Sequence, residues 1–343
     1  MKIIKTYRNA FLLLSVLLLI CFLFNISLGS VHVPIKDIIY TFLGDQTVKD
    51  SWQYIILDYR LPKAITAIIV GAGLGVSGLL MQTLFRNPLA GPYVLGLSSG
   101  ASLGVAIVIL GASLFSASFA SILLSKWSLV IASSIGSFLV LLAVVTVSLK
   151  IKNTMAILII GLMFASVTAS IVTVLSYFSS AEELQRYMFW TFGSLGNLSW
   201  DELKIFTLLF FIGITMSIVS IKALDTLLLG DNYARSMGLN LKKQRFIIII
   251  ATSIIAGSIT AFAGPIGFIG LAVPHLTKLL FNTSSHKILV PAVLLFGAIL
   301  MLICDSIAQL PNSQYTLPIN TVTSLFGAPV IIWLLIRKKK MFG

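Results

Sequence analysis

Charged side chains are scarce in this chain. They account for 10% of its 343 residues, whereas 58% of the residues are hydrophobic. A water-soluble domain of this length needs a mostly polar exterior and could not bury that much apolar surface. The composition therefore excludes a soluble domain and predicts a protein whose apolar surface is covered by lipid.

Cysteine and histidine are also rare. The two cysteines, Cys21 and Cys304, lie within apolar runs far apart in the sequence. We interpret them as small buried apolar residues and not as a disulfide or metal pair. The three histidines, His32, His275 and His286, share no metal-ligand spacing. The sequence therefore predicts neither a metal site nor a bound cofactor.

Motifs for catalysis or for ATP hydrolysis are missing. The sequence has no G-x-x-x-x-G-K-[ST] phosphate loop, no H-E-x-x-H pair and no serine in a nucleophile elbow. Carboxylates that could couple transport to protons or sodium are scarce, since Asp305 is the one clear acid within an apolar run. For Asp305 we favour a structural role. We predict a protein that is not an enzyme and has no energy source of its own.

Long apolar runs dominate the rest of the sequence. A helix needs about 20 apolar residues to cross a bilayer, and only helices or closed barrels satisfy the backbone there. Ten runs predict transmembrane helices at residues 9–29, 62–83, 94–112, 127–149, 154–178, 203–222, 244–263, 266–283, 288–308 and 320–336. The predicted fold is an all-α polytopic protein of the inner (cytoplasmic) membrane, with residues 1–343 forming a single transmembrane domain.

Basic residues outnumber acidic ones and give a formal net charge of +13. They form short clusters between apolar runs, unlike the basic stripe of a nucleic-acid-binding face, so no nucleic-acid partner is expected. Most of them fall in segments predicted to lie on the same side of the membrane as the N-terminus, including the cluster at residues 337–340. Since Lys and Arg are enriched on the cytoplasmic side of membrane proteins, both termini are predicted to be cytoplasmic.

Small residues recur at a spacing of four within two predicted spans. One set is Ala67, Gly71 and Gly75, and the other is Gly96, Gly100 and Gly104. Because membrane helices are held together by packing, small residues at this spacing let two helices approach closely, and we favour this explanation. The alternative is that a polar set on the second of these spans borders a path for a transported molecule. This set is Ser98, Ser99, Gly100 and Ser102.

The tripeptide Ala-Gly-Pro occurs twice. It stands at residues 90–92 and at residues 263–265, and a Gly-Leu pair follows each copy a few residues later. The copies lie five predicted spans apart and hence in opposite orientation. This pattern is expected of an inverted repeat that relates spans 2–5 to spans 7–10.

The predicted cytoplasmic loop at residues 223–241 is unusually apolar. Its leucine-rich first part is too short to cross a membrane and ends at Gly230. We predict that Asp231 caps the N-terminus of a second short helix at residues 232–237 and that Gly238 ends this helix. Two short helices would then present Tyr233, Met237 and Leu239, either to a protein partner or to the lipid surface.

Five stretches of the sequence together resemble one family of membrane proteins. They are Arg60–Lys63 (RLPK), Gly71–Ser102, Leu229–Leu239 (LGDNYARSMGL), Ala263–Lys278 (AGPIGFIGLAVPHLTK) and Phe326–Leu335 (FGAPVIIWLL). In this order, and over essentially the whole chain, they resemble the permeases for iron siderophores, haem and vitamin B12, the type II ABC importers.

The resemblance implies a ten-helix permease subunit that forms the translocation path with a second permease, identical or homologous. It also implies two cytoplasmic ATPase subunits, which bind the ATP, and an extracytoplasmic substrate-binding protein. The residues that it assigns to ATPase coupling are Leu229, Gly230, Asp231, Ala234, Arg235, Gly238 and Leu239. Arg60 and Lys63 match the basic positions that dock the binding protein in this family.

Two positions depart from the family pattern. Gln309 stands where the family commonly has arginine, and residues 315–320 lack the Glu and Gly that often flank the Leu-Pro pair. Docking through the loop between the last two spans is therefore not expected to follow the family.

The resemblance implies an importer of an iron chelate, with a ferric siderophore as the favoured cargo. Haem and vitamin B12 are the alternatives within the family. An ion-coupled secondary transporter is the alternative of another class. It would import without any ATPase and would stop when an uncoupler dissipates the ion gradient.

Overall fold

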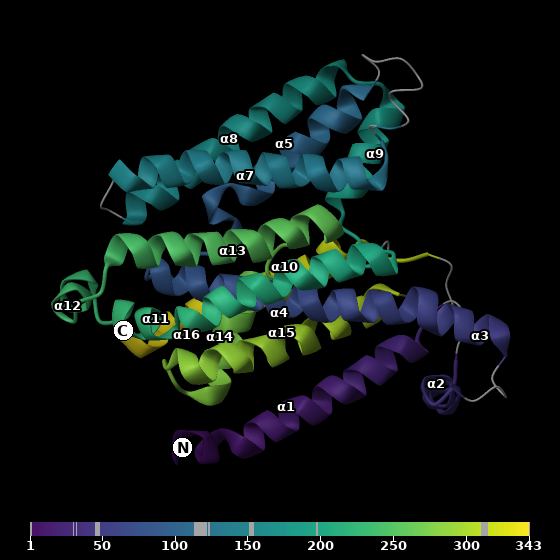
Figure 1. Ribbon diagram of the computed structural model, residues 1–343, viewed down its shortest axis with the longest axis horizontal. Helices are drawn as coiled ribbons and strands as arrows, with labels where there is room; N and C mark the ends of the chain where they lie inside the picture. Colours follow the sequence, from purple (N-terminus) through teal and green to yellow (C-terminus); the bar gives the residue numbers. More distant parts are fainter. Residues whose placement is uncertain are drawn as a thin grey trace. The chain divides into compact units, whose positions relative to one another are not determined.

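The computed structural model is built from helices (Figure 1). It describes residues 2–29, 31, 33–44, 49–112, 122, 124–150, 154–196, 198–309 and 315–342, and no strand occurs among them. His32 and the loop at residues 310–314, both considered above, lie outside the described residues. The all-α prediction is confirmed for the described part of the chain.

The helices follow one another in the order α1 to α16. Their bounds are α1 Lys2–Ser27, α2 Ile35–Phe42, α3 Asp50–Tyr54, η1 Ile55–Arg60, α4 Leu61–Leu84, η2 Pro92–Leu95, α5 Leu97–Leu110, α7 Lys126–Lys150, α8 Thr154–Phe178, α9 Ala181–Thr191, α10 Trp200–Val219, α11 Ile221–Leu227, α12 Asp231–Ser236, α13 Leu241–Ala263, α14 Ile269–Phe281, α15 His286–Ala308 and α16 Ile319–Phe342.

Seven of these segments are long and apolar enough to cross a membrane, counted over the described residues. They are Tyr7–Ser27, Asp50–Leu84, Lys126–Val144, Ala156–Phe178, Trp200–Val219, Leu241–Ala263 and His286–Ala308. The predicted spans 94–112, 266–283 and 320–336 correspond to the shorter apolar helices Leu97–Leu110, Ile269–Phe281 and Ile319–Trp333. Every predicted span thus contains a helix, while the total of ten crossings and the side of the termini stay predictions.

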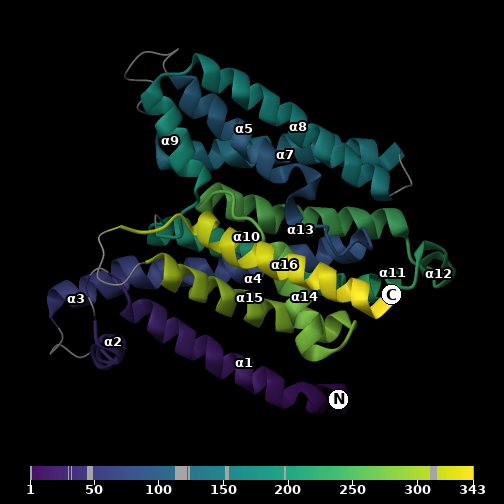
Figure 2. The same cartoon turned by 180° about the vertical axis from the view of Figure 1, so that it is seen from behind.

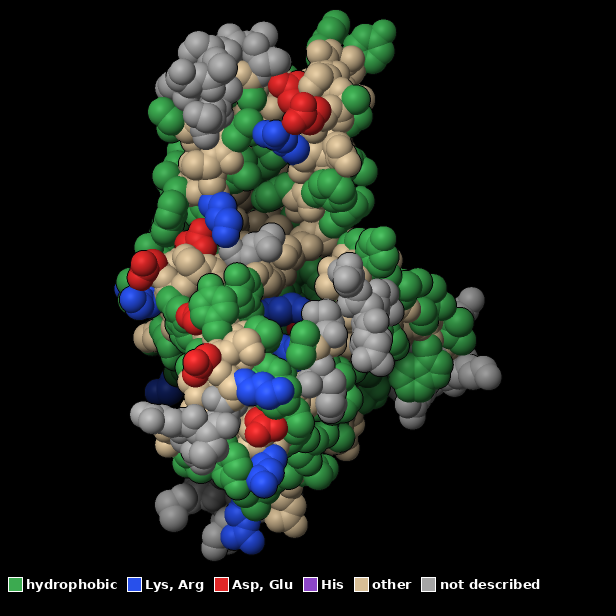
Figure 3. All heavy atoms as spheres, turned by 90° about the vertical axis from the view of Figure 1, so that its right-hand side faces the viewer, with side chains coloured by type: hydrophobic (Ala, Val, Ile, Leu, Met, Phe, Trp, Pro, Cys, Tyr) green, Lys and Arg blue, Asp and Glu red, His purple; other side chains and the backbone are tan. Residues whose placement is uncertain are grey.

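Large hydrophobic side chains are exposed along four of the long helices, α1, α7, α8 and α10. On α1, for example, Leu12 is 58% and Leu13 67% exposed, and on α7 Phe138 is 59% exposed. Figure 3 looks at the end of the molecule where α3 lies and shows Lys, Arg, Asp and Glu side chains among hydrophobic ones. Exposed apolar flanks with charges near the helix ends are the surface that a bilayer covers.

The chain divides into two compact units. One comprises Met1–Val76, Ser194–Leu208 and Ile266–Gly343, and the other comprises Ser77–Gly193 and Leu209–Pro265. We refer to them as unit 1 and unit 2 and describe each by itself. The prediction of a single transmembrane domain over residues 1–343 stays a prediction.

In unit 1, α4 and α15 touch backbone to backbone. A Cβ atom added to Gly71 would lie 2.1 Å from the carbonyl oxygen of Gly297, and one added to Gly297 would lie 2.3 Å from that of Gly71. A Cβ atom on Gly75 would meet the Val293 side chain at 2.9 Å. The packing explanation for the small residues of this span is therefore confirmed.

In unit 2, α5 and α7 meet in the same way. A Cβ atom on Gly100 would lie 2.5 Å from the Gly136 carbonyl oxygen, and one on Gly104 would lie 2.1 Å from that of Ala132. These contacts bury Gly100 between two helices. Gly100 therefore serves helix packing, and its predicted place beside a transport path stays a prediction.

The two Ala-Gly-Pro copies lead into similar local structures. Each precedes a short helix, α5 with 14 residues and α14 with 13 residues. Each of these helices begins after a residue with positive φ, Gly96 at +76° and Phe268 at +65°. The copies thus share a backbone break followed by a short helix, which supports an internal repeat; its inverted arrangement stays a prediction.

Candidate coupling and docking sites

The loop at residues 223–241 forms the two short helices that the sequence predicts. We call α11 and α12 together the α11–α12 hairpin (Figure 1). Gly230 joins the helices with a φ of +108°, and Gly238 follows α12 with a φ of +79°. The Gly238 and Leu239 amides donate to the carbonyls of Arg235 and Ala234, at 2.9 and 3.0 Å. This is a Schellman ending, so the predicted role of Gly238 is confirmed.

Asp231 does not cap α12, contrary to the prediction. It is the first residue of the helix, and Gly230 precedes it without any side-chain capping bond. Its carboxylate instead pairs with two guanidinium groups, through Oδ1 with Arg86 and through Oδ2 with Arg245 at 2.5 Å. Both carboxylate oxygens thus form charge-assisted bonds with arginine in place of a bond to a backbone amide of α12.

The two arginines come from distant parts of the chain. Arg86 lies just after the end of α4, and Arg245 lies in the second turn of α13. One carboxylate therefore ties α12 to both segments, all within unit 2. Sequence reasoning missed Arg86 because nothing local marks a pairing between residues that are 145 positions apart, and it missed Arg245, 14 positions from Asp231, because the two residues lie on different helices.

The α11–α12 hairpin exposes several large apolar side chains among polar ones. Leu229 and Met237 are each 64% exposed, and Leu228 and Tyr233 are also exposed. Ala234, by contrast, is fully buried and holds α12 to the unit. We call the exposed set Leu228, Leu229, Tyr233 and Met237 the hairpin patch. Arg235 is exposed beside it. A patch of this kind marks a contact with a protein or with lipid.

Arg60, a predicted docking residue, has internal partners in unit 1. Its Nη1 donates to the carbonyl oxygens of Ile26 at 2.8 Å and Ser27 at 3.1 Å, and its Nη2 donates to that of Val31. The last carbonyls of a helix lack partners within the helix, and a cation there is favourable. Gly29 makes room, because a Cβ atom there would lie 2.6 Å from Nη2. These contacts favour a structural role for Arg60.

Lys63, the second predicted docking residue, joins a buried polar cluster between α1, α4 and α15. Its Nζ lies 3.1 Å from Oδ1 of Asp305. Oδ2 of Asp305 accepts from Asn25 at 2.9 Å and from Gln309 at 2.8 Å. Asp305 is thus buried and fully engaged, which agrees with its predicted structural role. Gln309, where the family commonly has arginine, is buried and directed toward this carboxylate.

The predicted path residues lie in the first turns of α5 but do not share one environment. Ser98, Ser99 and Ser102 are half-buried. Ser102 forms a hydrogen bond with Tyr187 of α9, which is buried in a cluster with apolar residues of α5. Burial raises the pKa of the Tyr187 hydroxyl above its ordinary value, and the hydrogen bond acts in the opposite direction.

A cavity of about 330 Å³ lies in unit 2 between α5, α7, α10 and α13. Several small and hydroxyl-bearing residues line it. None of the predicted path residues on α5 is among its lining residues, and Leu97, which precedes them, is the one α5 residue that lines it. The polar and small lining residues are Ser134, Ser137, Ser253, Gly257 and Ser258. Sequence reasoning pointed to the small residues of the span at 244–263 without naming these serines, although serine and glycine at a spacing of four on α13 were a visible signal.

The sequence matches one protein family and two of its characterised relatives over most of its length. The model of the FecCD transport family matches residues 17–337. The hemin transport system permease protein HmuU of Yersinia pestis is 32% identical over 94% of this chain and 95% of that protein. The vitamin B12 import system permease protein BtuC of Klebsiella pneumoniae subsp. pneumoniae is 34% identical over 95% of this chain and 93% of that protein.

A solved structure agrees with these matches. It is described as an inward-facing conformation of a metal-chelate type ABC transporter. It superposes with a TM-score of 0.84 and 27% identity over 96% of this chain and 100% of that chain. The resemblance inferred from five sequence stretches is therefore confirmed. The chain belongs to the FecCD transport family and is a multi-pass membrane permease subunit of a type II ABC importer.

Proposed function

We propose that this permease imports an iron chelate, with a ferric siderophore as its cargo. The names of its relatives refer to hemin, vitamin B12 and a metal chelate, each of which is a metal held by a large organic ligand. The cavity in unit 2 supports a path that binds its cargo weakly, because hydroxyl groups and apolar side chains line it and no charged side chain is among its lining residues. Haem and vitamin B12 stay the alternatives.

We further propose that the permease works with a second permease, identical or homologous, with two cytoplasmic ATPase subunits that bind ATP, and with an extracytoplasmic binding protein. The sequence has no phosphate loop, so the energy has to come from a partner. The observation that carries this proposal is the α11–α12 hairpin. It exposes an apolar patch, and two ion pairs of Asp231, with Arg86 and Arg245, attach it to the rest of unit 2.

In this mechanism the hairpin transmits force as a rigid element. ATP binding draws the ATPase subunits together, and their movement displaces the hairpin. Because Asp231 links α12 to the segments of Arg86 and Arg245, this displacement passes to the end of α4 and to α13. α13 also lines the cavity. Alternating access then exposes the cavity to one side of the membrane at a time.

Cross-linking in the assembled transporter tests the coupling proposal. Met237→Cys places a thiol on the hairpin patch, and Lys204→Cys places one near the opposite end of the α10–α11 helical stretch as a matched exposed control. We expect nucleotide-dependent cross-links to the ATPase from position 237 and none from position 204. A complex that imports cargo but never yields the ATPase adduct at 237 would refute the coupling proposal.

A transport assay tests the cargo. Proteoliposomes that contain the complete complex are supplied with radiolabelled ferric siderophores, haem or vitamin B12, each with the matching binding protein. We expect ATP-dependent accumulation of a ferric siderophore. Accumulation of haem or vitamin B12 alone would replace the cargo and leave the coupling proposal standing.

A further inference from the structure

The helix α2 lies crosswise to the long helices of unit 1. In Figures 1 and 2 it is seen end-on, while α1 and α15 extend across the picture. The link from α1 is folded back, because the Ser27 hydroxyl donates to the Val33 carbonyl at 2.7 Å and Arg60 binds the Val31 carbonyl. α2 therefore begins at the level where α1, a membrane-crossing helix, ends at Ser27.

One face of α2 is apolar and exposed. Ile35, Ile39 and Phe42 are 45%, 44% and 43% exposed, and Leu43 just after the helix is 75% exposed. Residues at this spacing lie on one side of a helix. The buried residues of α2, Ile38 and Thr41, lie on another side of the helix. A crosswise helix at the end of a membrane span, with an outward apolar face, has the geometry of an interfacial helix.

Aromatic and basic side chains pair on α2 and at the start of α3. Lys36 lies over the ring of Tyr40 at 5.3 Å, and Lys49 lies over that of Trp52 at 4.9 Å. Tryptophan and tyrosine are enriched where a membrane meets water, and lysine extends its ammonium group from apolar surface toward the headgroups. The exposed face of α2 is thus bordered by residues typical of the headgroup layer.

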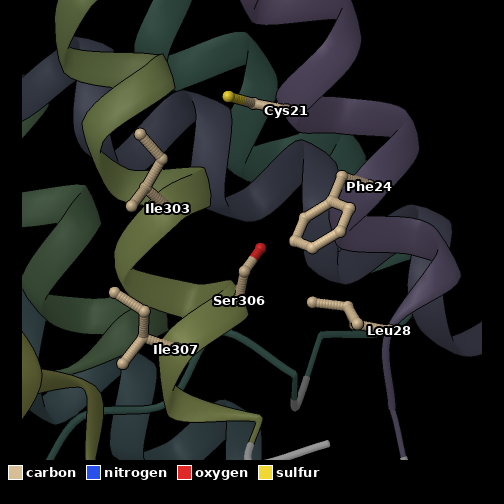
Figure 4. A pocket seen from close by; sticks show the side chains of 6 residues that line it. All are labelled: Cys21, Phe24, Leu28, Ile303, Ser306 and Ile307. Carbon is tan, nitrogen blue, oxygen red and sulfur yellow. The ribbon is translucent and has the colours of Figure 1, made fainter.

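A groove of about 380 Å³ runs between the last turns of α1 and α15 (Figure 4). Its lining residues are Cys21, Phe24, Leu28, Ile303, Ser306 and Ile307. The only hydroxyl among them, that of Ser306, already donates to the Leu302 carbonyl at 2.8 Å and accepts from Asn25 at 3.1 Å. The groove is therefore apolar in character, and it lies in the last turns of α1, before the folded link to α2.

We propose that α2 is an interfacial helix whose exposed face is embedded among the lipids of one leaflet, and that a phospholipid acyl chain occupies the α1–α15 groove. The leaflet is the one at the C-terminal end of α1, which is the outer leaflet in the predicted orientation. The proposal depends on family membership as a membrane permease and not on the identity of the cargo.

Depth measurement by spin labelling tests the helix. The full-length chain, isolated with its co-purifying subunits and with Cys21 and Cys304 replaced by alanine, is placed in nanodiscs of phosphatidylglycerol and phosphatidylethanolamine. Nitroxides are attached at Ile39→Cys and, as the control on the polar border, at Lys36→Cys. Position 39 should show a several-fold higher ratio of oxygen to nickel-chelate accessibility than position 36. Equal ratios would overturn the proposal, and so would shielding of position 39 from both reagents, because a protein would then cover this face.

Photo-cross-linking tests the groove. Benzoylphenylalanine replaces Phe24, which is 53% exposed in the groove, or Leu12, which is 58% exposed on the same helix outside it. The complex is extracted in detergent, purified and irradiated, and adducts are identified by mass spectrometry. We expect a phospholipid adduct at position 24 in several-fold excess over position 12, and its loss when Ile303→Trp fills the groove. Equal adducts at both positions, no adduct, or a protein adduct at position 24 would overturn the acyl-chain site.

Discussion

Replacing Asp231 by asparagine should uncouple ATP hydrolysis from import. Asparagine keeps the shape of the side chain but removes the charge that Arg86 and Arg245 share. The hairpin patch would still contact the ATPase, whereas the link from α12 to the end of α4 and to α13 would be weakened. The expected defect is therefore in the transfer of motion and not in assembly.

The magnitude follows from the exposure of the partners. The Arg86 pair is exposed, at 44% and 32%, and exposed pairs contribute about 0–1 kcal/mol. Arg245 is only 17% exposed, and a charge-assisted bond in such a place contributes about 1–2 kcal/mol after allowance for the partly exposed carboxylate. The sum of about 1–3 kcal/mol corresponds to about a 5- to 150-fold fall in the equilibrium constant for holding the hairpin in place.

Proteoliposomes with the complete transporter provide the assay. ATP hydrolysis and cargo uptake are measured together, and the number of cargo molecules imported per ATP should fall in Asp231→Asn by a factor of up to about 150. Arg86→Gln should reduce this ratio less than Arg245→Gln, because Arg86 is more exposed. Asp201→Asn, which breaks an ion pair of an 85% exposed acid, is the control. An unchanged ratio in Asp231→Asn would refute the reasoning.

Two further predictions concern packing and the buried polar cluster. Gly71→Ala places a Cβ atom 2.1 Å from the Gly297 carbonyl oxygen and should lower the melting temperature in detergent by several degrees. Gly257→Ala is the control, because its Cβ atom meets nothing closer than 4.0 Å and should leave the melting temperature unchanged. Equal shifts in the two variants would contradict the packing. Lys63→Met leaves the buried carboxylate of Asp305 without its cation and should lower the free energy of unfolding by about 3–5 kcal/mol, measured by denaturant titration. Adding Asp305→Asn should restore much of this loss. Additive losses in the double variant would contradict the pairing.

The positions of the helices could be predicted from the sequence because their causes are local. The thickness of a bilayer sets the length of an apolar run, and backbone groups in lipid have to be bonded within the run itself. Each predicted span accordingly contains a helix, although the helical stretch Asp50–Leu84 starts well before the predicted span at 62–83. Gly238 was also predictable, because the end of a helix needs a residue that tolerates positive φ.

The partners of the charged residues were decided only by the tertiary structure. Asp231 had the local features of a helix cap, yet two arginines brought next to it by folding bind its carboxylate instead. The docking of a partner protein by Arg60 and Lys63 stays a prediction, and only the structure shows helix carbonyls beside one and a buried carboxylate beside the other. The sequence by itself determined where helices form, since hydrogen bonds within a helix join near neighbours. Which side chains neutralise one another depends on how distant helices pack, and no local pattern encodes that.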